Sequence, residues 1–245
     1  MSAPTANRPA PVFNRMRRSA QIEILDGEVE TADLADILHD LARFNGIMQG
    51  HQPVLRWLDR AVKGLPPNRP LTLLDIGSGY GDLLRAVRGW ARKRGRSLRL
   101  IGVDLSPQVV DVARSVTPDS DEIEYHAADI FAFTPPAPID LVVTSLVTHH
   151  LSDELIARFL RWIETNASRG WMIYDLQRSV IPFYFIAFAG IVLRLHPVVT
   201  YDGRVSVARS LTRREWEDRL AAAGIPRNSV DLRWFMFRFA IGRLK

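Results

Sequence analysis

The chain has 245 residues, of which 47% are hydrophobic and 24% are charged, and its net charge is +5. This length and composition suit one α/β domain with an added cap, and they allow a sizeable buried core. The sequence contains no cysteine, which excludes a disulfide framework, a thiolate metal site and a cysteine-held iron–sulfur cluster.

Three regions follow one another along the chain. Residues 1–20 combine prolines with four arginines and lack an apolar run, so we expect a flexible leader without a secretion signal, and a cytoplasmic protein. Residues 21–66 predict a helical cap, because apolar residues recur at helical spacing over 31–44 and again over 51–62. Residues 67–245 are then expected to form the principal domain.

Predicted strands alternate with helices through the principal domain. This order indicates an α/β fold with a Rossmann-like, mostly parallel sheet and right-handed crossovers. Ligands of such sheets bind beyond the carboxyl ends of the strands. The five expected strands cover residues 71–76, 98–104, 123–127, 139–145 and 169–175, and two more extended runs lie at 231–234 and 236–242.

The most informative stretch joins the first strand to the helix that begins near Asp82. Gly77, Gly79 and Gly81 let the backbone approach a ligand where a Cβ would clash. Their spacing departs from the Gly-x-Gly-x-x-Gly dinucleotide fingerprint, and no Gly-Lys-Ser/Thr follows. The Asp82 carboxylate would repel a pyrophosphate at the helix N-terminus. The pattern therefore favours a cationic or zwitterionic nucleoside over a ligand held by phosphates.

With these residues, the chain resembles the class I S-adenosylmethionine (SAM)-dependent methyltransferases. Four segments in the expected order carry the resemblance: the glycine motif, a second strand with a ribose-binding acid, an adenine-contacting segment, and a fourth strand with a substrate-facing loop. They are Asp75-x-Gly77-x-Gly79-x-Gly81, Leu100 to Pro107, His126 to Ile130, and Asp140 to Leu146 followed by His149-His150-Leu151.

The resemblance covers residues 71–245 and implies a seven-stranded sheet with an antiparallel last strand. It also implies an apolar helical insertion after the fifth strand, at about 179–210. The implied cofactor is SAM, which leaves as S-adenosylhomocysteine (SAH).

The same resemblance assigns residues to the cofactor. Asp104 would accept hydrogen bonds from the ribose hydroxyls, as its place at a strand end also suggests. The alternative for Asp104 is a helix-capping acid, although Ser106 already fills that role. Asp129 would accept from the adenine amino group, or serve only in a turn. The full expected set is Asp75, Gly77, Ser78, Gly79, Gly81, Asp104, Leu105, Asp129, Ile130 and Ser145.

Two histidines, His149 and His150, are the catalytic candidates. Methyl transfer mainly requires alignment of the acceptor and exclusion of water, but a phenolic acceptor would profit from a base. Adjacent residues of an extended segment point in opposite directions, so we expect one histidine to face the acceptor, and we favour His149. Both could instead be structural. No metal-ligand cluster is evident from the spacing, so we expect a metal-independent reaction.

The second informative feature is the apolar run from Val180 to Leu193. It is too short to span a bilayer comfortably, and its four aromatic residues suit a roof over an apolar or aromatic acceptor. A buried core helix and interfacial contact with a membrane are the alternatives. The residues expected to line the acceptor pocket are Phe44, Tyr174, Arg178, Phe183, His196 and Tyr201.

The predicted function is SAM-dependent O-methylation of a small aromatic, phenolic, polyketide-like or lipid-like acceptor in secondary metabolism. One rival is an RNA methyltransferase, which would need a continuous basic surface, whereas the arginines are spread along the chain. A second is a non-catalytic methyltransferase-like binding protein, against which the intact glycine motif and the acids argue. A nicotinamide oxidoreductase is disfavoured by the glycine spacing. The oligomeric state is left open.

Overall fold

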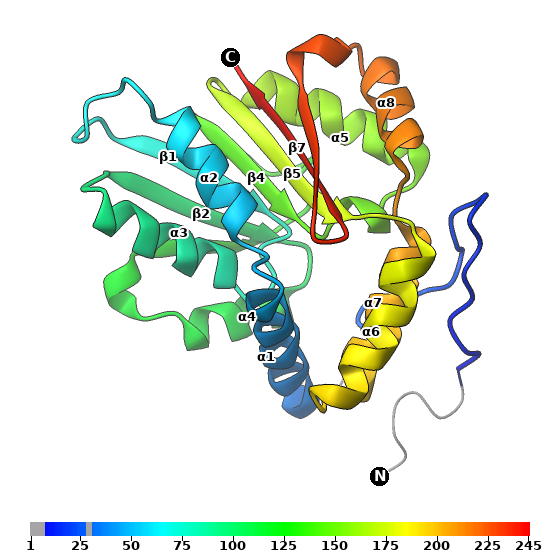
Figure 1. Cartoon of the computed structure of the whole chain (residues 1–245). Helices are drawn as coiled ribbons and strands as arrows, with labels where there is room; N and C mark the ends of the chain where they lie inside the picture. The colour runs from blue at the N-terminus through cyan, green and yellow to red at the C-terminus, as the bar shows by residue number, and fades with distance from the viewer. Residues whose placement is uncertain (1–7, 28–30) are drawn as a thin grey trace.

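The computed structural model describes residues 8–27 and 31–245, and a seven-stranded sheet forms its centre (Figure 1). The strands are β1 (Leu71–Ile76), β2 (Leu98–Asp104), β3 (Ile123–Ala127), β4 (Leu141–Ser145), β5 (Gly170–Leu176), β6 (Asp231–Phe235) and β7 (Arg238–Leu244). Their order in space is β3-β2-β1-β4-β5-β7-β6. Neighbours from β3 to β5 are parallel, and β7 is antiparallel to both β5 and β6. The predicted Rossmann-like sheet with an antiparallel last strand is confirmed.

Helices connect and flank the strands. The helices of the described residues are α1 (Thr31–Ile47), α2 (Gln52–Ala61), α3 (Asp82–Lys93), α4 (Pro107–Val116), α5 (Asp153–Asn166), α6 (Val180–Val192), α7 (Pro197–Arg209) and α8 (Arg213–Ala222), with short 3-10 turns η1 (Asp119–Asp121), η2 (Thr148–His150) and η3 (Arg227–Ser229).

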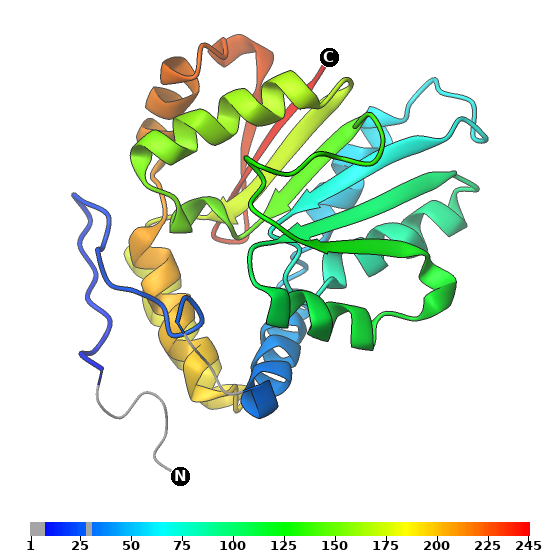
Figure 2. The same cartoon turned by 180° about the vertical axis from the view of Figure 1, so that it is seen from behind.

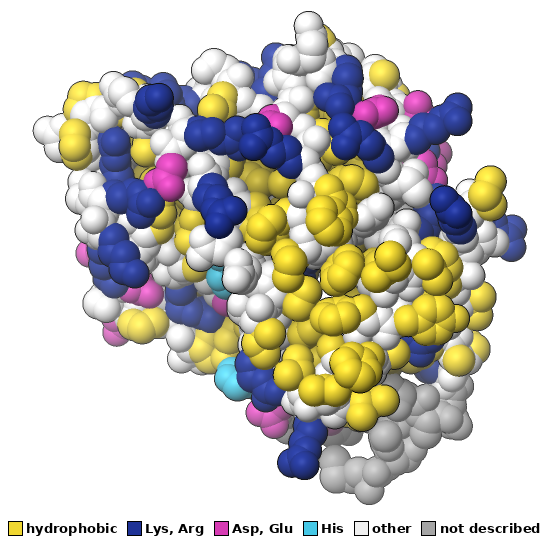
Figure 3. Space-filling view, viewed as in Figure 1, with side chains coloured by type: hydrophobic (Ala, Val, Ile, Leu, Met, Phe, Trp, Pro, Cys, Tyr) yellow, Lys and Arg dark blue, Asp and Glu magenta, His cyan; other side chains and the backbone are white. Residues whose placement is uncertain are grey.

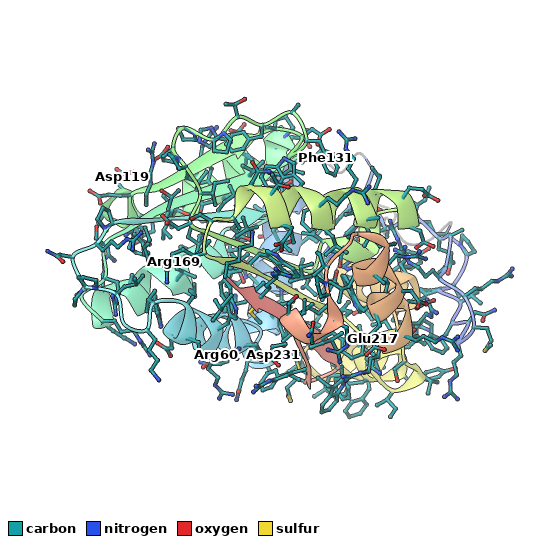
Figure 4. All side chains as sticks on the ribbon, turned by 90° about the horizontal axis from the view of Figure 1, so that it is seen from above. Arg60, Asp119, Phe131, Arg169, Glu217 and Asp231 are labelled. Carbon is teal, nitrogen blue, oxygen red and sulfur yellow. The ribbon has the colours of Figure 1, made fainter. Side chains whose placement is uncertain are left out.

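The sheet is covered on both faces because side chains alternate along each strand. Leu73 of β1 packs with α2, α3 and α4, whereas its neighbour Leu74 packs with α5 and α8. Figure 4 shows this sandwich from above, with Arg60 of α2 near Asp231 of β6, with which it forms a 2.8 Å ion pair. The sheet therefore has two cores, and its carboxyl edge is left for other elements.

The order of the strands creates a switch point beside β1. The chain proceeds from β1 to β2 and β3 on one side, then crosses to β4 and β5 on the other. Crossovers on opposite sides of one strand leave a crevice at its carboxyl end, which is where open α/β sheets bind ligands. The glycine motif follows β1 and therefore lies at this crevice.

A third core lies beyond the carboxyl edge, where α1, α6 and α7 gather (Figure 1). Phe44 of α1, Phe183 and Ile186 of α6, and Val198 of α7 are all buried in it. The α1 and α2 helices occupy the region predicted to be a helical cap, although residues 21–27 are not helical.

The flexible leader was predicted over residues 1–20, of which residues 1–7 lie outside the described residues. Residues 8–20, together with 21–27, pack along α6 and α7 (Figure 2). Arg18 anchors this segment to the rest of the protein, because its guanidinium donates hydrogen bonds to several half-buried acceptors. Its acceptors are the backbone oxygens of His149, Leu151 and Arg209 at 2.9, 2.9 and 2.6 Å and the Asp153 carboxylate at 3.0 Å.

The Arg18 anchor can be tested by substitution. Arg18→Ala is expected to lower the free energy of unfolding by about 2–4 kcal/mol, because it removes several charge-assisted hydrogen bonds at once. Exposed Arg17 is the matched control, and Arg17→Ala should change the free energy by less than about 0.5 kcal/mol. Urea denaturation measures both, and equal stabilities of the two variants would contradict the anchor.

Candidate active site

The glycine motif adopts a left-handed backbone at all three glycines, with φ of +69° at Gly77, +50° at Gly79 and +76° at Gly81. A Cβ at Gly77 would lie 2.2 Å from a methyl of Val147, and one at Gly81 would lie 2.2 Å from the Tyr125 hydroxyl. A Cβ at Gly79 would meet no atom of the described residues within 4 Å. Gly77 and Gly81 are thus required by packing within the protein, and Gly79 alone faces open space.

Asp104 joins the end of β2 to the glycine turn. Its Oδ2 accepts a hydrogen bond from the Gly79 amide at 2.9 Å, and its Oδ1 accepts from the Ser106 amide at 3.1 Å. The adjacent Leu105 side chain is 75% exposed, which is unusual for a large apolar group and provides a surface for a flat apolar ring. A carboxylate and an apolar surface therefore lie together beside Gly79.

The remaining strand ends contribute polar groups to the same edge. Asp129 is exposed and accepts a hydrogen bond from the Phe131 amide at 2.9 Å, which matches its alternative as a turn residue. Ile130 is buried in the second core, and Ser145 at the end of β4 is half-buried. Because β1 to β4 are parallel, these residues share one edge with Gly79.

Asp75 is a buried acid beneath the glycine turn and is only 2% exposed. Its Oδ1 has no hydrogen-bond partner among the described residues, so the expected bracing of backbone amides is not seen for this atom. Burial, and then the negative charges of Asp82 and Asp104, raise the pKa of Asp75 well above its ordinary value. The buried Ser78 hydroxyl likewise lacks a partner in the part of the chain that is described. These two groups therefore leave hydrogen-bonding capacity for a polar ligand beside the glycine turn.

A second buried polar pair lies where β5 and β7 meet. Arg238 donates from Nη2 to Asn45 Oδ1 at 2.7 Å, while its Nη1 finds no partner within the described ranges. Its guanidinium carbon lies 5.2 Å from the ring centre of Tyr174, whose hydroxyl is also buried and unpartnered there. Burial raises the pKa of Tyr174 and lowers that of Arg238. Tyr174 was predicted from the sequence, whereas Arg238 was not, because its only signal is that a basic residue opens an apolar strand.

His149 is 2% exposed and is held from behind by Asp175 at the end of β5. Its Nδ1 lies 2.7 Å from Asp175 Oδ1, and its backbone amide donates to Asp175 Oδ2 at 3.1 Å. Burial raises the pKa of Asp175. The charge of His149 and the hydrogen bonds that Asp175 accepts from His149, Thr148 and the Leu176 amide outweigh this effect and bring the pKa to about 2. The ring is therefore fixed by an ionised carboxylate.

Glu23 belongs to the N-terminal segment, residues 8–27, and its carboxylate faces both histidines. No sequence pattern predicts this contact. Its Oε1 lies 3.6 Å from His149 Nε2, and its Oε2 lies 3.7 Å from His150 Nε2. The expectation that the two rings diverge is wrong, because these residues form a 3-10 turn, and their ring centres are 4.2 Å apart. Direct proton transfer by either ring stays a prediction.

Several expected acceptor residues have structural contacts. Arg178 is buried and pairs with Glu215 at 2.5 Å, at the start of α8. His196 caps α7, where its Nδ1 accepts from the Val198 amide at 3.3 Å. The Tyr201 hydroxyl donates to a backbone oxygen of the N-terminal segment. Tyr174 lies in the core formed with α2, α3 and α4, whereas Tyr201 lies against the third core.

The apolar helix α6 buries one side and exposes the other. Phe183 and Ile186 enter the third core, and the opposite side forms an apolar surface, visible over α6 in Figure 3. We call it the α6 face, and it consists of Ile181, Tyr184, Phe188, Ile191 and Val192. Among the described residues, no helix is long and apolar enough to cross a membrane.

The distinction between Gly79 and Gly81 predicts different costs of adding one methyl group. Gly79→Ala should lower the free energy of unfolding by about 1–2 kcal/mol, through the left-handed backbone alone. Gly81→Ala should lower it by about 2–5 kcal/mol, because its Cβ also collides with Tyr125. Thermal and urea unfolding measure both variants, and a larger loss for Gly79→Ala would refute the packing role of Gly81.

Part of this chain matches a known protein family, and part of it is similar to known enzymes. Residues 73–168 match the family described as a methyltransferase domain. A trans-aconitate 2-methyltransferase of Azoarcus sp. (strain BH72) is 32% identical over 120 residues. That match covers 45% of this chain and 44% of the relative, so it spans less than half of either protein.

Solved structures extend the likeness to the whole fold. The plantazolicin methyltransferase BpumL in complex with SAH has a TM-score of 0.62 at 16% identity, covering 88% of this chain and 95% of that one. Human N-acetylserotonin methyltransferase in complex with SAM has a TM-score of 0.60 at 17% identity, covering 88% and 56%. Residues 73–168 of this chain therefore match the methyltransferase-domain family, and the chain as a whole shares the fold of methyltransferases solved with SAM or SAH.

Proposed function

We propose that this protein transfers a methyl group from SAM to an oxygen atom of a small organic acceptor. The observation that carries the proposal is the crevice beyond β1, where the open backbone of Gly79 lies beside the Asp104 carboxylate. The Asp75 carboxyl is buried beneath this crevice, and its Oδ1 has no hydrogen-bond partner among the described residues. A cationic nucleoside suits this combination, and a ligand held by phosphates does not.

The adenosine end of the cofactor would lie along the ends of β2 and β3. Asp104 would accept hydrogen bonds from the ribose hydroxyls in place of, or beside, its bonds to backbone amides. Leu105 would cover the adenine ring with its exposed side chain. The exposed Asp129 carboxylate would accept from the adenine amino group, with Ile130 at the floor.

The amino-acid end would lie toward Arg238. SAM carries a carboxylate, an ammonium and a sulfonium, and this side of the crevice offers charges of both signs. The Nη1 of Arg238, which has no partner among the described residues, suits the carboxylate. The Asp82 carboxylate complements the positive charge of the cofactor, and the buried Asp75 carboxyl offers it a hydrogen bond. We therefore propose Arg238 as a cofactor residue in addition to those predicted from the sequence.

The sulfonium supplies the chemistry, since it is itself a strong methyl donor. The chain would contribute alignment of the acceptor and exclusion of water, which are proximity effects. The third core of α1, α6 and α7 closes the carboxyl edge of the sheet with buried aromatic residues such as Phe44 and Phe183. This apolar surrounding favours an aromatic, phenolic or polyketide-like acceptor.

Asp104→Asn should weaken SAM binding at least tenfold, because a neutral amide replaces the charged acceptor of the ribose hydroxyls while keeping its size. Asp111→Asn, on the exposed side of α4, is the matched control and should bind SAM normally. Isothermal titration with SAM measures both dissociation constants. Unchanged affinity in Asp104→Asn would remove this residue from the cofactor site, and no SAM binding by the parent protein would refute the proposed function.

We also propose that the α6 face meets a lipid surface, from which a lipid-like acceptor would enter. The face is apolar, and basic side chains adjoin its end: Arg194 follows the helix, and Arg43 donates to the Leu193 carbonyl at 2.7 Å. An apolar face with basic neighbours is typical of helices that lie in the interface of anionic membranes.

Vesicle binding tests the α6 face. The Phe188→Ser/Ile191→Ser protein should lose at least tenfold in partitioning to phosphatidylglycerol vesicles, because two large apolar side chains no longer enter the lipid. Leu155→Ser removes an exposed apolar residue on α5 and should leave partitioning unchanged. Sedimentation with vesicles gives both values. Equal partitioning of the two proteins, or none by the parent, would contradict membrane contact.

A further inference from the structure

We propose that Glu23, His149 and His150 bind a divalent transition-metal ion of the zinc type. Each residue offers one ligand atom, and these atoms all lie within 4.8 Å of one another. Two imidazoles and a carboxylate are a donor set that zinc commonly takes in proteins. No sequence motif signals this cluster, because Glu23 lies far from the histidines along the chain.

The histidine rings are oriented as metal ligands are. Nδ1 of His149 lies 2.7 Å from Asp175, and Nδ1 of His150 lies 2.9 Å from Asp26. A carboxylate behind a histidine fixes its tautomer and directs the other ring nitrogen to the metal. In both rings that other nitrogen, Nε2, faces Glu23.

The spacing of the ligand atoms also fits an ion between them. The Nε2 atoms lie 3.6 and 3.7 Å from the Glu23 oxygens. These distances are longer than the donor–acceptor distances of ordinary hydrogen bonds. They are close to the separation of about 3.3 Å between neighbouring ligands of a tetrahedral zinc ion with bonds of about 2.0–2.1 Å. Small side-chain shifts would bring all three ligands into place.

Glu23 supplies an independent observation. Its side chain is buried, with the residue only 4% exposed, and Oε1 has no hydrogen-bond partner in the described part of the chain. A buried carboxylate oxygen without a hydrogen bond is costly, and a coordinated cation removes that cost. The segment is also held in position, since Asp202 accepts hydrogen bonds from the Ile24 and Leu25 amides at 2.7 and 3.0 Å.

The surrounding charges leave room for a dication. The carboxylates of Glu23, Asp26 and Asp175 contact the histidines, and one guanidinium, Arg209, contacts Glu23 and Asp26. Arg18, the other nearby cation, already pairs with Asp153. Imidazoles that bind a metal are neutral, and in that state three negative charges stand against one positive charge, so a divalent ion balances them.

The ion would fasten the N-terminal segment to the turn after β4. Glu23 comes from that segment, and the histidines come from η2 at the carboxyl edge of the sheet. Three protein ligands leave a fourth position open for water. The His150 side chain is 32% exposed, which provides access to that position. This role does not depend on the proposed methyl transfer.

Zinc titration of the full chain, stripped with chelator and dialysed, tests the site. We expect one zinc ion per chain by isothermal titration and a thermal midpoint that rises with zinc concentration, because the ion binds the folded form. Glu23→Gln should weaken zinc binding at least 100-fold with little change of shape. Asp26→Asn should weaken it about 10–100-fold through loss of the carboxylate behind His150.

Exposed His39 on α1 provides the matched control, and His39→Ala should bind zinc as the parent does. Substitution by Co2+ should give the intense visible absorption of a tetrahedral site. The proposal is overturned if the parent binds no zinc, if Glu23→Gln binds it equally well, or if His39→Ala abolishes binding. SAM titration of the same samples separates this result from the proposed function, since neither readout requires the other.

Discussion

The hydrogen bond from the Gly79 amide to Asp104 joins the two strand ends on which the crevice proposed for the cofactor depends. It exists because β1 and β2 are parallel neighbours in register, so that the turn after one strand meets the last residue of the other. The crossover to β4 on the opposite side of β1 then keeps the space above the turn open. Packing of Gly77 against Val147 and of Gly81 against Tyr125 holds the turn in shape.

The elements beyond the carboxyl edge depend on this sheet in turn. The third core places α1, α6 and α7 over the edge, and the N-terminal segment is tied down by Arg18 and Asp202. This segment delivers Glu23 to the histidines after β4. One edge of the sheet therefore carries the crevice proposed for the cofactor, the apolar core proposed to face an acceptor and a cluster of metal-ligand type.

Local patterns predicted the sheet well. The strands over 71–76, 98–104 and 123–127 end where they were expected. The first two are rich in apolar residues, and the third alternates apolar with polar residues, as strands do. Local patterns could not predict which segments far apart in the sequence would contact one another. Nothing near Glu23 or Arg238 signals their partners, and the histidines were expected to diverge because an extended segment was assumed where a 3-10 turn forms. Arg178 and His196 were expected to line the acceptor pocket. Instead, Arg178 pairs with Glu215 at the start of α8, and His196 caps α7.

A crystal structure of the protein with SAH tests the central claim most directly. The account predicts that the ribose hydroxyls contact Asp104, that the backbone of Gly79 lies against the ligand, and that the amino-acid carboxylate points to Arg238. Adenosine bound away from Gly79 and Asp104, or protein side chains filling the crevice in the presence of saturating SAH, would contradict it.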